Sequence, residues 1–193
     1  MSDFVVPDKI APEIGWRVWL VVDHEAGLLL HSAVQAKVEW PARQALQAEC
    51  RRIPALEIVG EPRLGPAHQS PDQTCGTGGG HGCGIYATKT AAACGDFLKG
   101  SYSPSQVRGA SVVHRVIGKV ALWGKVIEGE IGWRAEYAYP REIWVPREFH
   151  VASGVDIGAV RPPGLPLEEI ACGLAAYGVP VSFTSVDPDT LAA

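Results

Sequence analysis

Residues 112–145 read VVHRVIGKVALWGKVIEGEIGWRAEYAYPREIWV. β-Branched and aromatic side chains dominate this stretch, and turn-forming residues interrupt it at 129–132 and again at Pro140 and Arg141. This pattern predicts antiparallel strands in a curled sheet. A glycine inside a strand has no side chain to pack, so Gly118 and Gly124 are expected to mark bends or a close approach of two backbones.

Shorter patterns on both sides of this stretch predict the remaining elements. The expected strands, of which the first two form a hairpin, are 15–22, 27–32, 84–87 and 179–186. The expected helices, inferred from apolar residues at helical spacing, are 42–52, 88–98 and 167–178. Short strands with interspersed helices indicate an α+β fold, with an antiparallel, partly barrel-like sheet and about three helices.

Length and composition favour a single domain over residues 1–193. Hydrophobic residues make up 47% and charged residues 20%, as in ordinary globular proteins, and the apolar runs are too short to cross a membrane. An irregular loop at about 54–83 and a frayed C-terminal tail are expected outside the core. The first residues lack the basic and apolar segments of a secretion signal, so the cytoplasm is the expected compartment.

Four blocks of the sequence carry a resemblance to a known family. They are GWRVW at 15–19, WPARQALQAEC at 40–50, HGCGIYA at 81–87 and VIGKVALWGKVIEGEIGWRAEYAYP at 116–140. Together they resemble an uncharacterised family of actinobacterial and actinophage proteins, over most of residues 15–145. Its members carry no established activity, so the resemblance implies one compact, phage-related unit and no particular chemistry.

Cysteine and histidine side chains flank the glycine-rich run GTGGG at 76–80. Thiolate and imidazole ligands suit a tetrahedral zinc ion, and glycines let the backbone wrap closely around it. The expected ligands are Cys75, His81, Cys83 and, upstream, Cys50, with His68 as another candidate. Their spacing departs from paired CxxC knuckles, so a glycine loop between one buried and one surface cysteine is the alternative.

A second interpretation makes Cys83 a nucleophile, assisted by His81 or His114. A nearby imidazolium would favour the reactive thiolate. No third orienting group and no nucleophile motif accompanies these residues. A cysteine-dependent enzyme is therefore the alternative to a non-enzymatic, intracellular binding module with a metal-stabilised Cys/His loop.

Aromatic and basic side chains recur between residues 123 and 141. The expected ligand-binding residues are Trp123, Arg134, Tyr137 and Arg141, because flat rings beside guanidinium groups can stack on the bases of single-stranded nucleic acid. Alternating aromatics such as Trp133 and Tyr137 are also typical of a packed core. With a net charge of −4, nucleic acid would need a local basic surface, so the expected partner is either protein or nucleic acid.

Overall fold

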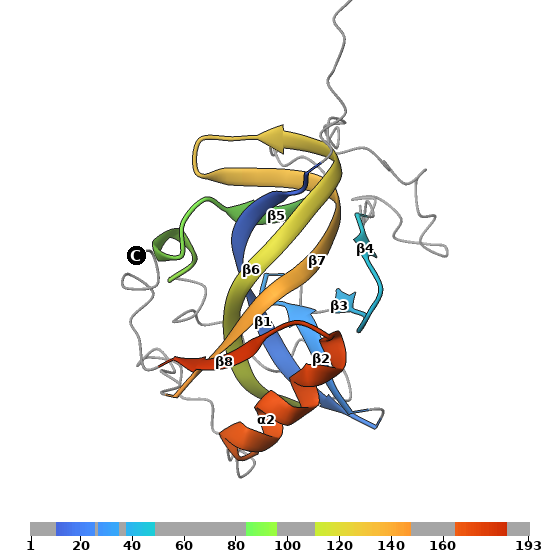
Figure 1. Cartoon of the computed structure of the whole chain (residues 1–193), viewed down its shortest axis with the longest axis vertical. Helices are drawn as coiled ribbons and strands as arrows, with labels where there is room; N and C mark the ends of the chain where they lie inside the picture. Colours follow the sequence, from blue (N-terminus) through green and yellow to red (C-terminus); the bar gives the residue numbers. More distant parts are fainter. Residues whose placement is uncertain are drawn as a thin grey trace, which may run out of the picture.

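The computed structural model describes residues 11–25, 27–34, 38–48, 84–95, 111–147 and 165–184. Most of them belong to one curled β-sheet, and a short α-helix packs at one end of it (Figure 1). The pairings between strands are antiparallel except for one parallel pair at the edge of the sheet.

Strands β1 (Glu13–His24) and β2 (Gly27–Ser32) form an antiparallel hairpin. The predicted hairpin is thus confirmed, with β1 two residues longer at each end. Residues 18–22 of β1 are all buried. Because successive side chains point to opposite faces of a strand, both faces of β1 are covered, which explains its unbroken apolar run.

The two longest strands, β6 (Ser111–Glu128) and β7 (Gly132–Pro146), run antiparallel and side by side (Figure 1). Their pairing register shifts twice, and Gly124 lies at the second shift with a φ of 70°. A Cβ atom on Gly118 would collide with the carbonyl oxygen of Glu142. Both expectations for these glycines are confirmed: Gly124 marks a bend and Gly118 a close backbone approach.

Short strands complete the described sheet. They are β3 (Glu39–Trp40), β4 (Leu46–Gln47), β5 (Ile85–Thr88) and β8 (Val181–Thr184). Strand β6 lies between β1 and β7, and the other edge of β7 carries β5, β4 and β8 in turn. Strand β5 also pairs with β1, through Thr88 and Trp16. The sheet therefore curls far enough to bring β1 and β7 to either side of β5.

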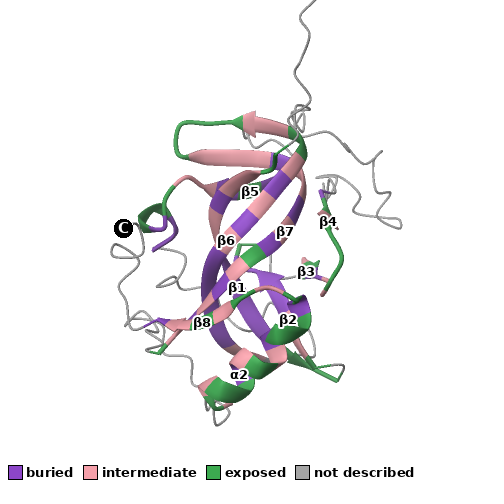
Figure 2. Ribbon diagram, in the orientation of Figure 1, coloured by how far each residue is buried: buried purple, intermediate pink, exposed green. Residues whose placement is uncertain are grey.

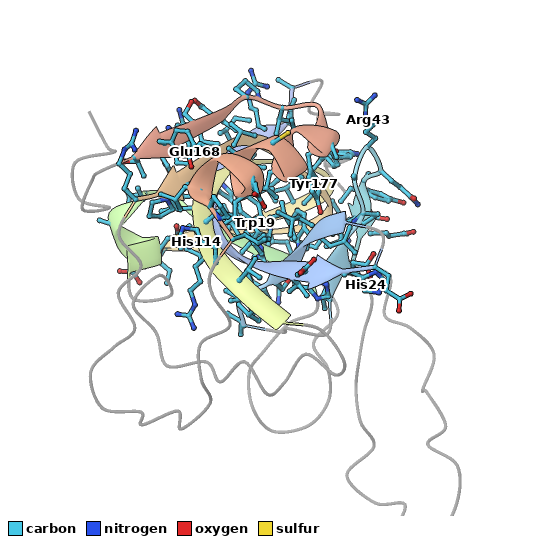
Figure 3. The ribbon with its side chains drawn as sticks, turned by 90° about the horizontal axis from the view of Figure 1, so that it is seen from below. Trp19, His24, Arg43, His114, Glu168 and Tyr177 are labelled. Atoms are coloured by element: carbon cyan, nitrogen blue, oxygen red, sulfur yellow. The ribbon has the colours of Figure 1, made fainter. Side chains whose placement is uncertain are left out.

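The main hydrophobic core lies within the curl, next to α2 (Leu167–Leu174) and the 3₁₀ turn η3 (Ala175–Tyr177). Leu174 and Tyr177 are fully buried in this core together with Trp19 of β1. Figure 3 shows Trp19 and Tyr177 between α2 and the β1–β2 hairpin, whereas Arg43 points outward. Buried residues concentrate along the middle of the long strands, and the turn between β6 and β7 is exposed (Figure 2).

The predicted fold class was wrong. The chain forms a mostly β structure with a mixed eight-stranded sheet that is not a true barrel, instead of an α+β fold with an antiparallel, partly barrel-like sheet and about three helices. The helix expected at 167–178 is present, as α2 and η3. None of the described helices has the length and apolar character needed to cross a membrane.

One predicted helix is replaced by extended chain in its described part, and a second is described only as far as residue 95. In the segment expected to be helical at 42–52, Leu46 and Gln47 pair with β7 as β4. The segment expected at 88–98 contains the end of β5 and the 3₁₀ turn η1 (Ala92–Cys94). The open edge of β7 offers backbone partners to Leu46 and Gln47, and such tertiary pairing overrides weak helix propensity. The loop expected at 54–83 and the expected C-terminal tail lie outside the described residues.

Candidate functional site

An open groove lies at the end of the sheet where β5 sits between β1 and β7. Residues of β1, β4, β5 and β7 line it, together with the turn that joins β6 to β7. Its volume is about 1420 Å³. We call this feature the β5 groove. Figure 1 shows the backbone of β5 near the tip of the long β6–β7 hairpin.

Exposed apolar side chains gather at the β5 groove. Among the described residues, the large apolar side chains that are exposed are Val34, Tyr86 and Ile131, with exposed fractions of 49%, 49% and 73%. All three line the groove, although Val34 follows β2, Tyr86 belongs to β5 and Ile131 to the β6–β7 turn. Apolar residues scattered singly over a surface need no explanation, whereas a converging set marks an interaction site.

Arg17 of β1 brings a guanidinium group to the β5 groove. It donates hydrogen bonds to the carbonyl oxygen of Tyr86 and to Ser32 Oγ, the latter over 3.0 Å, and lies 5.0 Å from the centre of the Trp40 ring. Its Nε is buried and has no hydrogen-bond partner. Burial lowers the pKa of the Arg17 guanidinium to about 10. No carboxylate of the described residues forms an ion pair with this cation.

Arg134 of β7 also lines the β5 groove. The β5–β7 register sets Arg134 directly opposite Tyr86, so their side chains project from one face of the sheet with Cβ atoms about 5 Å apart. The backbone carbonyl of Tyr86 accepts the hydrogen bond from Arg17. Arg17 shares a face of β1 with Gly15, where a Cβ atom would meet the Cβ of Ala87. The side chains of Arg17 and Arg134, the cations of the described groove lining, therefore project from opposite faces of the sheet.

Tyr137 also lines the β5 groove, and its hydroxyl accepts a hydrogen bond of 3.1 Å from Gln47 Nε2. Trp123 stacks on Tyr137, with 6.1 Å between ring centroids and 17° between the planes, but it is not part of the lining. Arg141 is exposed and lies outside the lining. Of the four residues expected to bind a ligand, the structure thus brings Arg134 and Tyr137 together, with Trp123 behind Tyr137 and Arg141 apart.

The core interpretation of the same aromatics also has support. Trp133 and Tyr139, both partly buried, pack against the main hydrophobic core. The hydroxyl of Tyr139 donates to the carbonyl oxygen of Tyr177 over 2.8 Å. The aromatic residues of β7 therefore divide between structural contacts and the groove.

Cys94 of η1 lines the β5 groove but is 2% exposed. Burial raises the pKa of its thiol, and a 2.9 Å contact with Thr88 Oγ1 and the charge of Arg17 offset this only in part. The thiol is protonated at neutral pH, which makes Cys94 a structural cysteine and a poor nucleophile.

The predicted metal ligands Cys50, Cys75, His81 and Cys83 lie outside the described residues. The zinc hypothesis and the nucleophile hypothesis for Cys83 therefore stay predictions. His114 is described; it is buried, and its Nε2 lies 2.9 Å from the carbonyl oxygen of Pro146. Elsewhere in the described ranges, no three His, Cys, Asp or Glu side chains are grouped to hold a metal ion.

Sequence reasoning missed Arg17, Tyr86 and Ile131. One signal was available for Arg17, because a charged side chain that interrupts the apolar run GWRVW requires a specific partner or a function. No comparable signal existed for Tyr86 and Ile131. Their convergence depends on the pairing of β5 with both β1 and β7, which a four-residue strand does not reveal.

No protein-family model matches the chain, and no curated protein or solved structure matches it either. The resemblance to actinobacterial and actinophage proteins accordingly stays a prediction. Function is therefore inferred from the chemistry of the β5 groove.

Proposed function

We propose that this chain is a non-enzymatic binding module that holds a segment of a partner protein in the β5 groove. The observation that carries the proposal is the convergence of Val34, Tyr86 and Ile131, the exposed large apolar side chains of the described residues, on one groove. Covering them with apolar side chains of a partner removes their surface from water, which favours association.

The size of the β5 groove favours a macromolecular segment over a small metabolite. Its volume of about 1420 Å³ exceeds the range of about 300–1,000 Å³ that is typical of pockets for small ligands. The groove is also partly open to solvent. A segment of several residues would fill it better than a compact molecule.

The charge of the lining favours protein over nucleic acid. The described lining has two cations, Arg17 and Arg134, and two anions, Glu39 and Glu128. Lys89 is bound to Glu128 over 2.6 Å and lies 5.7 Å from the Trp133 ring. A groove with balanced charge, in a chain of net charge −4, provides little of the phosphate neutralisation on which nucleic-acid affinity depends.

Selection from a displayed library of random peptides, followed by affinity measurement with the full-length chain, tests the proposal. Ile131→Asp should weaken the selected peptides at least about tenfold, because it removes an apolar contact and adds a charge at the groove. Arg141→Asp is the matched control, since it introduces the same charge at an exposed residue outside the lining, and it should leave affinity unchanged. Ile131 is 73% exposed, so neither variant should lose stability.

Three results would overturn the proposal. Equal loss of affinity in Ile131→Asp and Arg141→Asp would place binding elsewhere. Salt-dependent binding of short single-stranded oligonucleotides, without any peptide ligand, would make nucleic acid the partner. Failure to select any peptide would also contradict it.

We also propose that zinc stabilises the segment containing Cys50, Cys75, His81 and Cys83. The amide of Ala48 donates to Glu136 of β7 over 2.7 Å, and Ile85 pairs with the adjacent Ala135. In sequence, Cys50 follows Ala48 by two residues and Cys83 precedes Ile85 by two, so each cysteine is close along the chain to a residue that bonds to β7. The free thiols of Cys94 and Cys172 agree with the cytoplasmic compartment that we propose for the protein.

Metal analysis of protein purified without added metal tests this part of the proposal. We expect close to one equivalent of zinc, and a lower melting temperature in the presence of a chelator. Less than about a tenth of an equivalent, with stability unaffected by the chelator, would remove the metal site from the proposal.

A further inference from the structure

We infer that Arg17 anchors one acidic side chain of the partner segment on the core-facing wall of the β5 groove. This inference rests on the proposed function and names the chemistry of the partner. It involves Arg17 together with Ser32 and Trp40, which both contact it. Arg134 takes no part in it, because its side chain projects from the opposite face of the sheet.

The strand β1 places Arg17 below the surface of the groove. Arg17 shares a face of β1 with Trp19, which is fully buried in the main hydrophobic core. It still lines the β5 groove and bonds to the carbonyl oxygen of the exposed Tyr86. Its Nε is buried, while the residue as a whole keeps part of its surface exposed. The guanidinium is therefore recessed but remains within reach of the groove.

The charge of Arg17 has no counterion in the described part of the chain. Two of its five N–H donors bond to uncharged acceptors, the Tyr86 carbonyl and Ser32 Oγ, and its Nε–H has no partner. No described carboxylate forms an ion pair with it. A desolvated cation is costly unless an anion pairs with it. A carboxylate of the partner would supply the missing charge.

Ser32 adds a hydrogen-bond donor beside the guanidinium. Its Oγ accepts one hydrogen bond from Arg17 Nη2 and one from Trp40 Nε1, each over 3.0 Å. A hydroxyl has two acceptor lone pairs and one hydrogen, so Ser32 is left with its own hydrogen to donate. The three side chains form a cluster of donors, which suits a group that only accepts hydrogen bonds. An ionised carboxylate is such a group, and its bonds to a guanidinium are charge-assisted.

The depth and the charge of this cluster favour an acidic side chain over other anions. Val34, Tyr86 and Ile131 are exposed at the groove, whereas Ser32 is only 2% exposed. A segment that covers the exposed residues reaches the cluster with a side chain that extends into the groove. One guanidinium matches the single charge of an aspartate or glutamate, while a phosphoryl group carries about −1.5 to −2 and usually requires several cations.

Parallel selections of displayed peptides on the wild type and on Arg17→Met test the inference. The peptides have no free C-terminus, so any carboxylate belongs to a side chain. We expect peptides selected on the wild type to carry Asp or Glu at one fixed position, beside apolar residues. Arg17→Met keeps an unbranched side chain without the charge, so its peptides should keep the apolar residues and lose the acidic one. Arg141→Met removes a charge outside the lining and should select the same acidic peptides as the wild type.

Phenylacetate and phenylacetamide test the site without a peptide. They share one ring and about ten non-hydrogen atoms, and differ in charge. The full-length, ¹⁵N-labelled chain is titrated with each while the side-chain Nε–H signals of arginine are followed by NMR. We expect phenylacetate to shift Arg17 saturably, with a dissociation constant of about 1–10 mM, and to leave Arg134 and Arg141 unchanged. Phenylacetamide should bind at least about fivefold more weakly.

Several results would overturn the inference. They are equal enrichment of acidic residues on the wild type and on Arg17→Met, equal affinity for phenylacetate and phenylacetamide, a shift at Arg134 without one at Arg17, and no shift up to about 50 mM phenylacetate. Binding of phenylphosphate at least as tight as that of phenylacetate would overturn the assignment to a carboxylate. The comparison of the two phenyl compounds uses the wild type, so it decides the matter if Arg17→Met does not fold.

The outcomes also separate this inference from the proposed function. If selected peptides depend on Ile131 but carry no preferred acidic residue, and phenylacetate leaves Arg17 unchanged, the carboxylate site is wrong and the groove proposal survives. If phenylacetate shifts Arg17 and no peptide is selected, the carboxylate site stands and the partner is not a protein segment.

Discussion

The hydroxyl of Tyr177 joins the C-terminal helix to the sheet. It accepts a hydrogen bond from the Leu30 amide over 2.7 Å and donates one to the carbonyl oxygen of Trp40 over 2.6 Å. Tyr177→Phe leaves both buried backbone groups without their partner, so we expect it to lower the free energy of unfolding by about 1–3 kcal/mol. Urea unfolding at pH 7 measures the change, and a loss near zero would show that the two bonds contribute nothing net.

Tyr177 also makes the stability of the fold depend on pH in the alkaline range. Burial raises the pKa of Tyr177 from 10 to about 12, so the folded state keeps its proton where the unfolded state has lost it. The contribution of this raised pKa to the free energy of unfolding is complete below pH 10 and is lost as pH rises towards 12. The difference in unfolding free energy between the wild type and Tyr177→Phe should therefore fall by about 2 kcal/mol across this window. A constant difference would contradict the raised pKa.

The two described free cysteines should differ in reactivity. Cys94 is 2% exposed with a pKa raised by burial, whereas Cys172 is exposed on α2. In the folded protein at pH 8, iodoacetamide should alkylate Cys172 at least about tenfold faster than Cys94, as followed by mass spectrometry of the digested chain. Equal rates would show that the groove opens around Cys94. The rate at Cys83 in the same experiment tests the nucleophile hypothesis, which requires it to exceed the rate at Cys172.

Among the elements, the β6–β7 pair is the most sensitive to a small change in its sequence. A Cβ on Gly118 would collide with the Glu142 carbonyl and lie 2.8 Å from the ring of Trp19. Gly118→Ala must therefore separate the strands or displace a fully buried tryptophan, at a cost of about 3 kcal/mol or more. Gly129→Ala is the control, since its Cβ would meet nothing closer than 3.3 Å. Thermal unfolding of both variants measures the difference; similar melting temperatures would contradict the close approach.

Prediction of the elements succeeded where a pattern was long and failed where it was short. Strands β1, β2, β6 and β7 follow from β-branched and aromatic alternation over many residues, as does the amphipathic helix α2. Leu46 and Gln47 sit in a stretch of good helix formers and still form β4, because the free edge of β7 bonds their backbone. Local propensity contributes tenths of a kcal/mol per residue, so a few tertiary contacts reverse it.

At the scale of the whole molecule, the C-terminal segment 165–184 completes the core. Ile170, Leu174 and Tyr177 are fully buried in the main cluster, and β8 pairs with β7. A chain that ends at residue 164 should lose its cooperative thermal transition and its near-ultraviolet circular dichroism, because this apolar surface would be exposed. A chain that ends at residue 184 is the control, and the predicted frayed tail implies an unchanged melting temperature. Cooperative unfolding of the shorter chain would show that the segment is dispensable.

The candidate site was predictable only in part. Arg134 and Tyr137 were predicted to bind a ligand because aromatic and basic residues alternate along β7. Both line the β5 groove. Arg141 was chosen on the same grounds but lies outside the groove, since the strand continues past β4 towards β8. Spacing along one strand identifies residues on the same face, but it does not locate the point where that face meets another part of the chain.

The sequence by itself determined the long strands, the hairpin, the C-terminal helix and the special roles of Gly118 and Gly124. These depend on short-range rules: side-chain alternation, helical periodicity and the absence of a Cβ atom. Only the tertiary structure decided that the sheet is mixed, that residues 46–47 form a strand, and that Val34, Tyr86 and Ile131 line one groove. These features depend on pairings between residues far apart in the chain, such as Trp16 with Thr88 and Tyr86 with Arg134. Such pairings form where free strand edges and buried surface match in space, which no local pattern specifies.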